Sequence, residues 1–249
     1  MMTLDGRVSI VTGAGRHLGR AYALGLAAAG SAVVVADLAD AEPVAAEIRD
    51  RGGQALSVRI DVNDGQTLDT MAKTAFDAFG RIDALVNNAG YFKNAARSPI
   101  EDIEIDEWDR SFAINVRGTW LAAKAVLPAM KRAGYGKIVN IGSTTCLNGI
   151  PGFLHYVSAK SAIFGMTRAM ARELGEFGIC VNTLNPDLIP DDEMLRDNPA
   201  NNERAIAGRA LKRTETPEDM IGSVVFLCGP GSDFLTGQSV NVNGGNVFV

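Results

Sequence analysis

Short apolar runs alternate along the chain with longer segments in which apolar residues recur every three or four positions. The runs lie at residues 8–11, 32–36, 55–60, 84–86, 137–141, 180–184 and 239–242. The segments with three-or-four spacing lie at residues 20–29, 42–51, 68–79, 106–132, 156–177 and 217–227. Runs of the first kind predict buried strands, and segments of the second kind predict amphipathic helices. Strands that alternate with helices throughout predict an α/β fold, a doubly wound parallel sheet with about seven strands.

We expect residues 1–249 to form a single domain, because no linker-like stretch divides the chain. Residues 187–214 interrupt the regular alternation. Three acids, Asp191, Asp192 and Glu193, and the run Asp197-Asn198-Pro199-Ala200-Asn201-Asn202 fall in this segment. Such a composition favours a mobile substrate loop, with the acidic residues solvated.

A glycine-bearing turn, Thr12-Gly13-Ala14-Gly15-Arg16-His17-Leu18-Gly19, joins the first predicted strand to the first predicted helix. Glycines let the backbone approach a pyrophosphate, and the helix start offers unpaired N–H groups and the positive end of its dipole. Asp37 ends the second strand, where a carboxylate accepts hydrogen bonds from an adenosine ribose. This succession predicts a dinucleotide-binding βαβ unit and hence a Rossmann fold.

The net charge and the cysteine content limit the kinds of molecule that the protein is expected to bind. A net charge of −5 and a pI near 5.1 disfavour nucleic acid and anionic membranes. No apolar run approaches the roughly 20 residues that span a bilayer, and residues 1–5 lack the features of a signal peptide. Cys146, Cys180 and Cys228 are typical of reduced thiols, and two histidines disfavour a His-based metal centre. We therefore expect a cytoplasmic protein that binds a small molecule and no metal.

Tyr156 and Lys160 stand four positions apart in a predicted helix and so share one face. A phenol has an ordinary pKa of about 10 and is a poor base at neutral pH. A neighbouring ammonium and the positive ring of an oxidised nicotinamide favour the phenolate. Lowering the pKa to about 7–8 takes roughly 3–4 kcal/mol, which a partly desolvated site can supply. We predict that Tyr156 is a general base for an alcohol and a general acid in reverse; the plainer alternative is two side chains that merely share a surface.

Several motifs in order make nearly the whole chain resemble a short-chain dehydrogenase/reductase. They are the turn at 12–19, Asp61, Asn87-Asn88-Ala89-Gly90, Asn115, Ser143, Tyr156-Val157-Ser158-Ala159-Lys160 and Asn185-Pro186. Such an enzyme needs a cofactor, because no side chain accepts a hydride. The resemblance implies cofactor contacts from Gly13, Arg16, Leu18, Gly19, Asp37, Asp61, Val62, Asn88, Tyr156, Lys160 and Ile189.

The predicted catalytic residues are Asn115, Ser143, Tyr156 and Lys160. Ser143 follows a strand, and we expect it to donate a hydrogen bond to the substrate oxygen as charge develops. The resemblance implies that Asn115 holds a water in a proton relay that ends at Lys160. The alternatives are a serine in a strand-end turn and an asparagine satisfied by local backbone.

The sequence favours NAD as the cofactor, because the Asp37 carboxylate repels a 2′-phosphate. Arg16 is the counter-signal, since a basic residue in this turn often binds the phosphate of NADP. We predict an NAD-dependent dehydrogenase acting on a secondary alcohol or the corresponding ketone. The alternatives are an NADP-dependent ketoreductase of biosynthesis and a protein that senses dinucleotides without turnover. The set of Ser143, Tyr156 and Lys160 disfavours the last.

The predicted substrate wall is mostly apolar, which favours a substrate with a hydrophobic, cyclic or aryl body. Its candidates are Phe92, Cys146, Leu147, Ile150, Phe153, His155 and Met194. Of these, Cys146, Phe153 and His155 join Ser143 as the predicted substrate contacts. The competing interpretation for each is ordinary packing.

Two positions depart from the family pattern. His17 replaces the usual middle glycine of the turn, where a positive φ would be costly, and we expect its imidazole to face solvent with little part in catalysis. Pro186-Asp187 replaces the usual Pro-Gly after the sixth strand. The apolar tail at 244–249 and the small-residue face of the helix at 156–177 expose hydrophobic surface on a monomer, and the resemblance implies a homotetramer.

Overall fold

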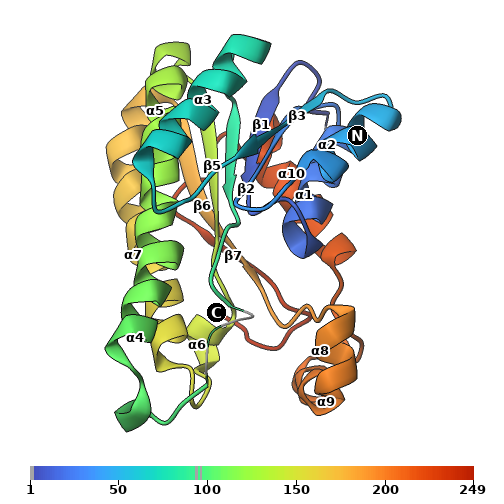
Figure 1. Cartoon of the computed structure of the whole chain (residues 1–249), viewed down its shortest axis with the longest axis vertical. Helices are drawn as coiled ribbons and strands as arrows, with labels where there is room; N and C mark the ends of the chain where they lie inside the picture. Colours follow the sequence, from blue (N-terminus) through green and yellow to red (C-terminus); the bar gives the residue numbers. More distant parts are fainter. Residues whose placement is uncertain (1–2, 93–94, 96) are drawn as a thin grey trace.

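The computed structural model describes residues 3–92, 95 and 97–249 (Figure 1). Within these residues one parallel sheet runs in the order β3-β2-β1-β4-β5-β6-β7. Its strands are β1 (Val8–Thr12), β2 (Ala32–Asp37), β3 (Ala55–Arg59), β4 (Ala84–Asn87), β5 (Gly136–Ile141), β6 (Ile179–Pro186) and β7 (Ser239–Val242). The predicted doubly wound α/β sheet with seven strands is therefore confirmed, as a Rossmann-type fold.

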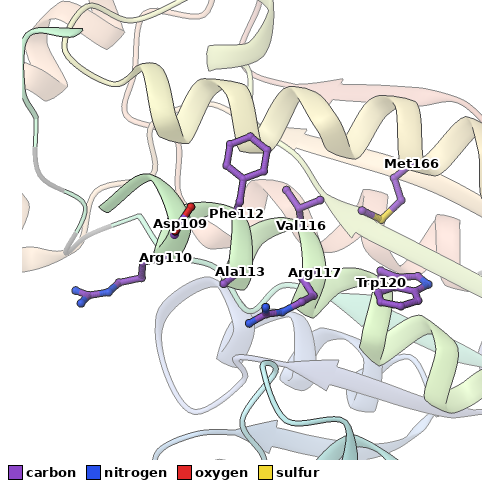
Figure 2. Close-up of a pocket in the computed structure, with 8 residues that line it drawn as sticks. All are labelled: Asp109, Arg110, Phe112, Ala113, Val116, Arg117, Trp120 and Met166. Atoms are coloured by element: carbon purple, nitrogen blue, oxygen red, sulfur yellow. The ribbon is translucent and has the colours of Figure 1, made fainter. Parts of the chain in front are cut away.

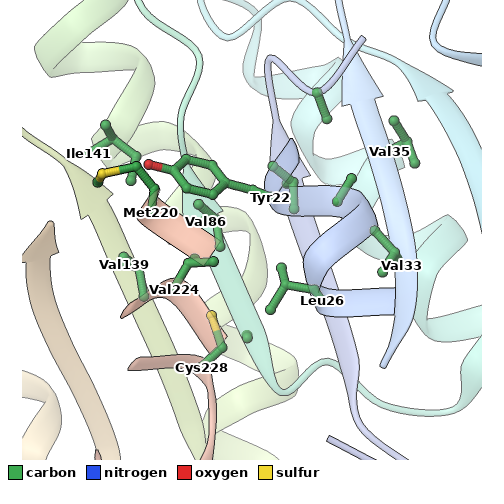
Figure 3. Packing of buried hydrophobic residues seen from close by; sticks show 14 of the residues in the cluster. Tyr22, Leu26, Val33, Val35, Val86, Val139, Ile141, Met220, Val224 and Cys228 are labelled. Carbon is green, nitrogen blue, oxygen red and sulfur yellow. The ribbon is translucent and has the colours of Figure 1, made fainter. Parts of the chain in front are cut away.

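Helices cover both faces of the sheet (Figure 1). On one face lie α1 (His17–Ala28), α2 (Glu42–Asp50) and α10 (Pro217–Cys228). The other face is covered by α3 (Gly65–Phe79), α5 (Thr119–Ala133) and α7 (Leu154–Leu174), with α4 (Ile105–Phe112) beside α7. Figure 3 shows the first core, where Tyr22 and Leu26 of α1 meet Val224 of α10 above the valines of β2 and β4. Burial of these apolar side chains fixes both helical layers against the sheet.

The strand order reverses between β1 and β4, which lie side by side with Val11 opposite Val86. In parallel sheets ligands bind outside the carboxyl ends of the strands at this reversal. Thr12 and Asn87 end the two strands. The fold therefore places the glycine-bearing turn and the Asn87–Gly90 motif on either side of one crevice.

The long helix expected at 106–132 is interrupted. A π-helical segment, η2 (Ala113–Gly118), separates α4 from α5 and contains the fully buried Asn115. Such π-helical turns often occur at functional sites, and the spacing of apolar residues does not reveal them because the hydrophobic stripe continues through the segment.

The segment at 187–214 contains two helices, α8 (Asp192–Asp197) and α9 (Pro199–Gly208), which lie apart from the helical layers at the end of the sheet (Figure 1). Asp191 is the N-cap of α8 and accepts a hydrogen bond from the backbone N–H of Met194 at 2.8 Å. Part of the acidic run therefore starts a helix and complements its dipole. The short helix α6 (Thr145–Asn148) follows β5 at the same end of the sheet, beside α7.

Candidate active site

A cavity of about 390 Å³ lies outside the ends of β1, β2 and β4. Its wall brings together eight of the predicted cofactor residues: Gly13, Arg16, Leu18, Gly19, Asp37, Asp61, Val62 and Asn88. They come from four separate stretches of chain. The predicted dinucleotide half of the site is therefore one continuous surface in the structure.

The turn at this cavity can accept a diphosphate. A Cβ atom on Gly19 would lie 2.0 Å from the carbonyl oxygen of Gly13, so only glycine allows the turn to close this tightly. Arg16, the N-cap residue of α1, makes no side-chain cap hydrogen bond. Leu18 and Gly19 of the first turn of α1 line the cavity, so an anion bound there would meet the positive end of the helix dipole. These features fit a nicotinamide dinucleotide.

Asn88 connects the two sides of the crevice. Its Nδ2 atom donates to the carbonyl oxygens of Thr12 and Gly13 at 3.0 and 2.9 Å. The Thr12 hydroxyl oxygen accepts from the backbone N–H groups of Asn88 and Ala89, both at 3.1 Å. Thr12 thus fixes the turn relative to β4, a positioning role that the sequence analysis did not assign to it.

Asp37 is held in the cavity by the backbone. Its Oδ2 atom accepts from the N–H of Gly15 at 2.8 Å, and its Oδ1 atom accepts from the N–H of Ala39 at 3.0 Å. Arg16 lines the same cavity with its side chain exposed. Asp37, which favours NAD, and Arg16, which favours NADP, therefore lie on the wall of the same cavity.

His17 has a positive φ of 47°, and its imidazole does not face solvent as expected. The ring is half-buried, and its Nε2–H donates to the carbonyl oxygen of Ile189 at 3.1 Å. It lines the cofactor cavity and also the adjoining cavity that holds Tyr156. The sequence could not show this contact, because it joins residues 172 positions apart.

The adjoining cavity, of about 470 Å³, contains Ser143, Tyr156 and Lys160. Tyr156 and Lys160 come from α7, and Ser143 comes from the turn after β5. All three are buried, at 7, 5 and 6% exposed for Ser143, Tyr156 and Lys160. Ile189 and Asn88 also line this cavity, so the predicted catalytic set lies at the end of the cofactor surface.

The protein's own groups do not lower the pKa of Tyr156, contrary to the expectation from its spacing to Lys160. Burial raises the pKa of Tyr156 well above the ordinary value for a phenol, although the Ser143 hydroxyl acts in the opposite direction. Burial also lowers the pKa of Lys160 to about 8, and its Nζ atom donates to the Ile141 carbonyl at 2.8 Å. The structure therefore favours the protonated phenol, which is the form that acts as a general acid.

The side-chain amide of Asn115 forms hydrogen bonds with the backbone of the segment that follows β4. Its Oδ1 atom accepts from the N–H of Tyr91 at 3.0 Å, and its Nδ2 atom donates to the carbonyl oxygen of Tyr91 at 3.2 Å. Its Oδ1 is 3.1 Å from where a Cβ atom on Gly90 would lie, and Lys160 Nζ is 3.6 Å from the same point. Asn115 thus fixes the segment after β4 beside Lys160, and the water relay stays a prediction.

The predicted substrate contacts other than Ser143 lie behind the cavity wall. Phe153 is buried and stacks on the ring of Tyr156, with centroids 4.8 Å apart. His155 is fully buried, with Nε2 3.5 Å from the Glu107 carboxylate, and the Cys146 thiol points toward the Val157 carbonyl. Of the wider candidates, Phe92 and Ile150 line the cavity, whereas Leu147 and Met194 do not. The predicted contacts were expected at the substrate because they adjoin the motifs in sequence. They pack within the protein instead, because adjacent positions on a helix face different ways.

A buried ionic cluster closes the cavity at Asp187, the position that departs from the family pattern. The Arg209 Nε atom donates to Asp187 Oδ2 at 2.8 Å, and its Nη2 atom donates to the Leu188 carbonyl at 2.7 Å. Glu215 lies 3.6 Å from Arg209, and its Oε2 atom accepts from the N–H of Asp187. Burial raises the pKa of Glu215 to about 8; Arg209 lowers it, whereas Asp187 and Asp219 raise it. The cluster anchors the start of the 187–214 segment through Arg209.

Another cavity, of about 690 Å³, lies away from these residues between α4, η2, α5 and Met166 of α7 (Figure 2). None of the predicted site residues lines it, and its wall includes Trp120, which is 48% exposed. Within the described residues, no three His, Cys, Asp or Glu side chains gather in a way that could hold a metal ion. No helix of the described chain has the length and apolar character needed to cross a membrane.

Comparison with known proteins gives the family. A family model described as enoyl-(acyl carrier protein) reductase matches residues 13–246. The chain is 37% identical to 3-oxoacyl-[acyl-carrier-protein] reductase of Synechocystis over 252 residues, covering 100% of both chains. It is 34% identical to the 7alpha-hydroxysteroid dehydrogenase of Escherichia coli K12 over 249 residues, covering 99% of this chain and 96% of that one.

Among solved structures, a gluconate 5-dehydrogenase from Burkholderia cenocepacia in complex with NADP and tartrate superposes with a TM-score of 0.91. It is 32% identical, and the match covers 97% of this chain and 95% of that one. Matches of this length and identity, together with the cavity that joins the glycine turn to Ser143, Tyr156 and Lys160, lead to one conclusion. The chain belongs to the short-chain dehydrogenase/reductase family and is an oxidoreductase.

Proposed function

We propose that the protein transfers a hydride between NAD(H) and a secondary alcohol or the corresponding ketone. The observation that carries this proposal is that Tyr156, Ser143 and Lys160 share a cavity with His17, Asn88 and Ile189, next to the dinucleotide surface. A bound nicotinamide dinucleotide supplies the hydride acceptor or donor. We place the body of the substrate against Phe92, Ile150 and Leu188, whose apolar side chains support a hydrophobic body.

The side chains divide the proton chemistry between them. In ketone reduction the Tyr156 O–H donates its proton to the carbonyl oxygen as negative charge develops there. The Ser143 hydroxyl donates a hydrogen bond to the same oxygen and stabilises that charge. In alcohol oxidation Tyr156 takes the hydroxyl proton, which requires the positive charge of Lys160 nearby because burial otherwise disfavours the phenolate.

The proposal of NAD rests on Asp37, whose carboxylate is fixed by two backbone N–H groups at the adenosine end. A 2′-phosphate beside this carboxylate is repelled. The second candidate is an NADP-dependent ketoreductase. It is favoured by Arg16 on the same cavity wall and by the NADP in the gluconate 5-dehydrogenase relative.

A panel of secondary alcohols and ketones tests this function, with the absorbance of the reduced cofactor as the measurement. We expect turnover with NAD and a lower kcat/KM with NADP. A kcat/KM for NADP equal to or above that for NAD would overturn the cofactor assignment. Binding of NADH without turnover of any alcohol or ketone would favour the dinucleotide-sensing alternative.

We also propose a homotetramer in the cytoplasm. The exposed apolar surface of the described residues includes the face around Trp120 (Figure 2) and the C-terminal Phe248 and Val249. Contact with further copies would bury both. The cysteines Cys146, Cys180 and Cys228 are all free thiols, as a reducing compartment allows. Light scattering should give the mass of four chains, and the mass of one chain would contradict the assembly.

A further inference from the structure

The cavity that contains Tyr156 also carries two guanidinium groups on its wall. They belong to Arg97, in the segment that follows β4, and to Arg204 on α9. The two segments are far apart in the sequence, and both reach the volume that holds the catalytic hydroxyl. Neither arginine belongs to a motif of the glycine turn or of the catalytic set.

Arg97 is held beside the catalytic ring. Its guanidinium carbon lies 5.1 Å from the centroid of the Phe153 ring, and Phe153 in turn stacks on Tyr156 at 4.8 Å. Stacking of a guanidinium on an aromatic face leaves its N–H groups free in the plane of the fork. Arg97 can therefore bind a planar anion while its position relative to Tyr156 stays fixed.

The charge on this wall is not neutralised by the protein. Within the described residues, no carboxylate lies within ion-pair distance of Arg97 or Arg204. Asp187 is an acid on the same wall, but it is already bound by Arg209 at 2.8 Å and by the Asn246 amide at 3.0 Å. Two guanidinium groups thus remain for a ligand from solution.

The phosphates of the cofactor do not account for these arginines. The diphosphate is expected at the turn between Gly13 and Gly19, on the wall of the neighbouring cavity. Neither Arg97 nor Arg204 lines that cavity. Both line only the part of the site that also contains Phe92 and Ile150, where the substrate body is placed.

We propose, building on the dehydrogenase function above, that the natural substrate is a secondary alcohol or ketone bearing an anionic group, which Arg97 and Arg204 bind. The anion is a carboxylate or a phosphate, because a guanidinium fork matches the oxygens of either. Asn201 and Asn246 line the same cavity and can donate to further oxygens of the anion. Ser143 and Tyr156 hold the reacting oxygen while the arginines fix the other end of the molecule.

The first test compares matched substrates with wild-type protein. 3-Hydroxybutyrate is assayed against 3-hydroxybutyramide for the carboxylate, and glycerol 3-phosphate against glycerol for the phosphate. We expect a kcat/KM about tenfold or more higher for one of the anions than for its neutral partner, which corresponds to one charge-assisted hydrogen bond. Equal values within both pairs would overturn the proposal.

The second test measures binding without turnover. Protein saturated with NADH is titrated calorimetrically with malonate, inorganic phosphate and malonamide. We expect malonate or phosphate to bind more tightly than malonamide, and each of Arg97→Gln and Arg204→Gln to weaken that binding about tenfold. Arg196→Gln is the matched control, since Arg196 is an exposed arginine of α8 that does not line the cavity.

The two tests separate the possible failures. Anion binding that depends on Arg97 and Arg204 in a protein without dehydrogenase activity would refute the proposed function and leave the anion site standing. Turnover of the preferred anionic substrate that is unchanged in the Arg97→Gln/Arg204→Gln double variant would refute the anion site alone. Thermal melts of every variant show whether the fold is intact, which we expect because both side chains are exposed.

Discussion

The ammonium group of Lys160 donates a hydrogen bond to the carbonyl oxygen of Ile141 at 2.8 Å, at the carboxyl end of β5. The sheet therefore fixes Lys160 within the cavity that also contains Tyr156, which lies one helical turn before it. Because both side chains are buried, a charge on Lys160 is little screened by water. This charge is also sensitive to pH, since burial lowers the pKa of Lys160 to about 8.

Lys160→Met should abolish most turnover without unfolding the protein. Methionine keeps the length of the stem and removes a buried charge, so we expect a melting temperature equal to or above that of wild type. We expect kcat to fall by about a hundredfold or more, as for the loss of a group that supports general acid–base chemistry. Steady-state kinetics and thermal melts check this, and wild-type kcat in a well-folded variant would contradict the role of Lys160.

The cofactor preference should depend on Asp37. Replacing it with serine removes the charge that repels a 2′-phosphate, so we expect the NADP-to-NAD ratio of kcat/KM to rise by about tenfold or more. Asp40→Asn is the matched control, because this acid lies on the same loop but outside the cavity. A ratio that shifts equally in both variants would show that Asp37 does not set the preference.

His17 should affect the stability of the protein in two ways, through backbone strain at its positive φ and through its hydrogen bond to Ile189. His17→Ala removes the hydrogen bond to Ile189 and keeps a side chain at positive φ, whereas His17→Gly removes the bond and relieves the strain. We expect the glycine variant to be more stable than the alanine variant by about 1 kcal/mol, measured by urea unfolding. Both should show the same increase in KM for the cofactor. Equal stabilities would contradict the strain at this position.

Glu215 should make stability depend on pH. Burial raises its pKa from the ordinary carboxyl range to about 8, so between about pH 5 and pH 8 the folded state holds a proton that the unfolded state has lost. The contribution of Glu215 to stability therefore falls as the pH rises through this range. Relative to wild type, Glu215→Gln should gain more than about 1 kcal/mol between about pH 5 and pH 9.

Urea unfolding at several pH values measures this difference. Glu203→Gln serves as the control, because Glu203 is exposed on α9 and its substitution should give a difference that does not change with pH. A stability difference for Glu215→Gln that stays constant or falls as the pH rises would rule out the buried, protonated carboxyl.

Local sequence predicted the sheet, and it picked out residues that the structure brings together, because both depend on short stretches of chain. The apolar runs fixed the strands, and the turn around Gly13 and Gly19 fixed the crevice beside them. Motifs such as Asn88 lie next to strand ends, and a parallel sheet brings the carboxyl ends of its strands to one edge. The structure accordingly places the predicted cofactor residues on two adjoining cavities.

Contacts between distant stretches could not be predicted in the same way. Asp187 stood out as a departure from the family, but its partner Arg209 comes from the end of α9. Arg97 and Arg204 belong to no motif, so only the folded cavity relates them to Tyr156. The pKa of Tyr156 depends on burial and on the direction of the Lys160 side chain, and spacing along a helix determines neither.

The most direct measurement of the central claim compares wild type with Tyr156→Phe, using NADH fluorescence for binding and cofactor absorbance for turnover. The variant loses one hydroxyl and keeps the ring that stacks on Phe153. We predict an unchanged Kd for NADH and a loss of kcat by about a thousandfold or more in both directions, next to an active parent. Turnover by Tyr156→Phe close to that of wild type would contradict the assignment of Tyr156 as the group that transfers the proton.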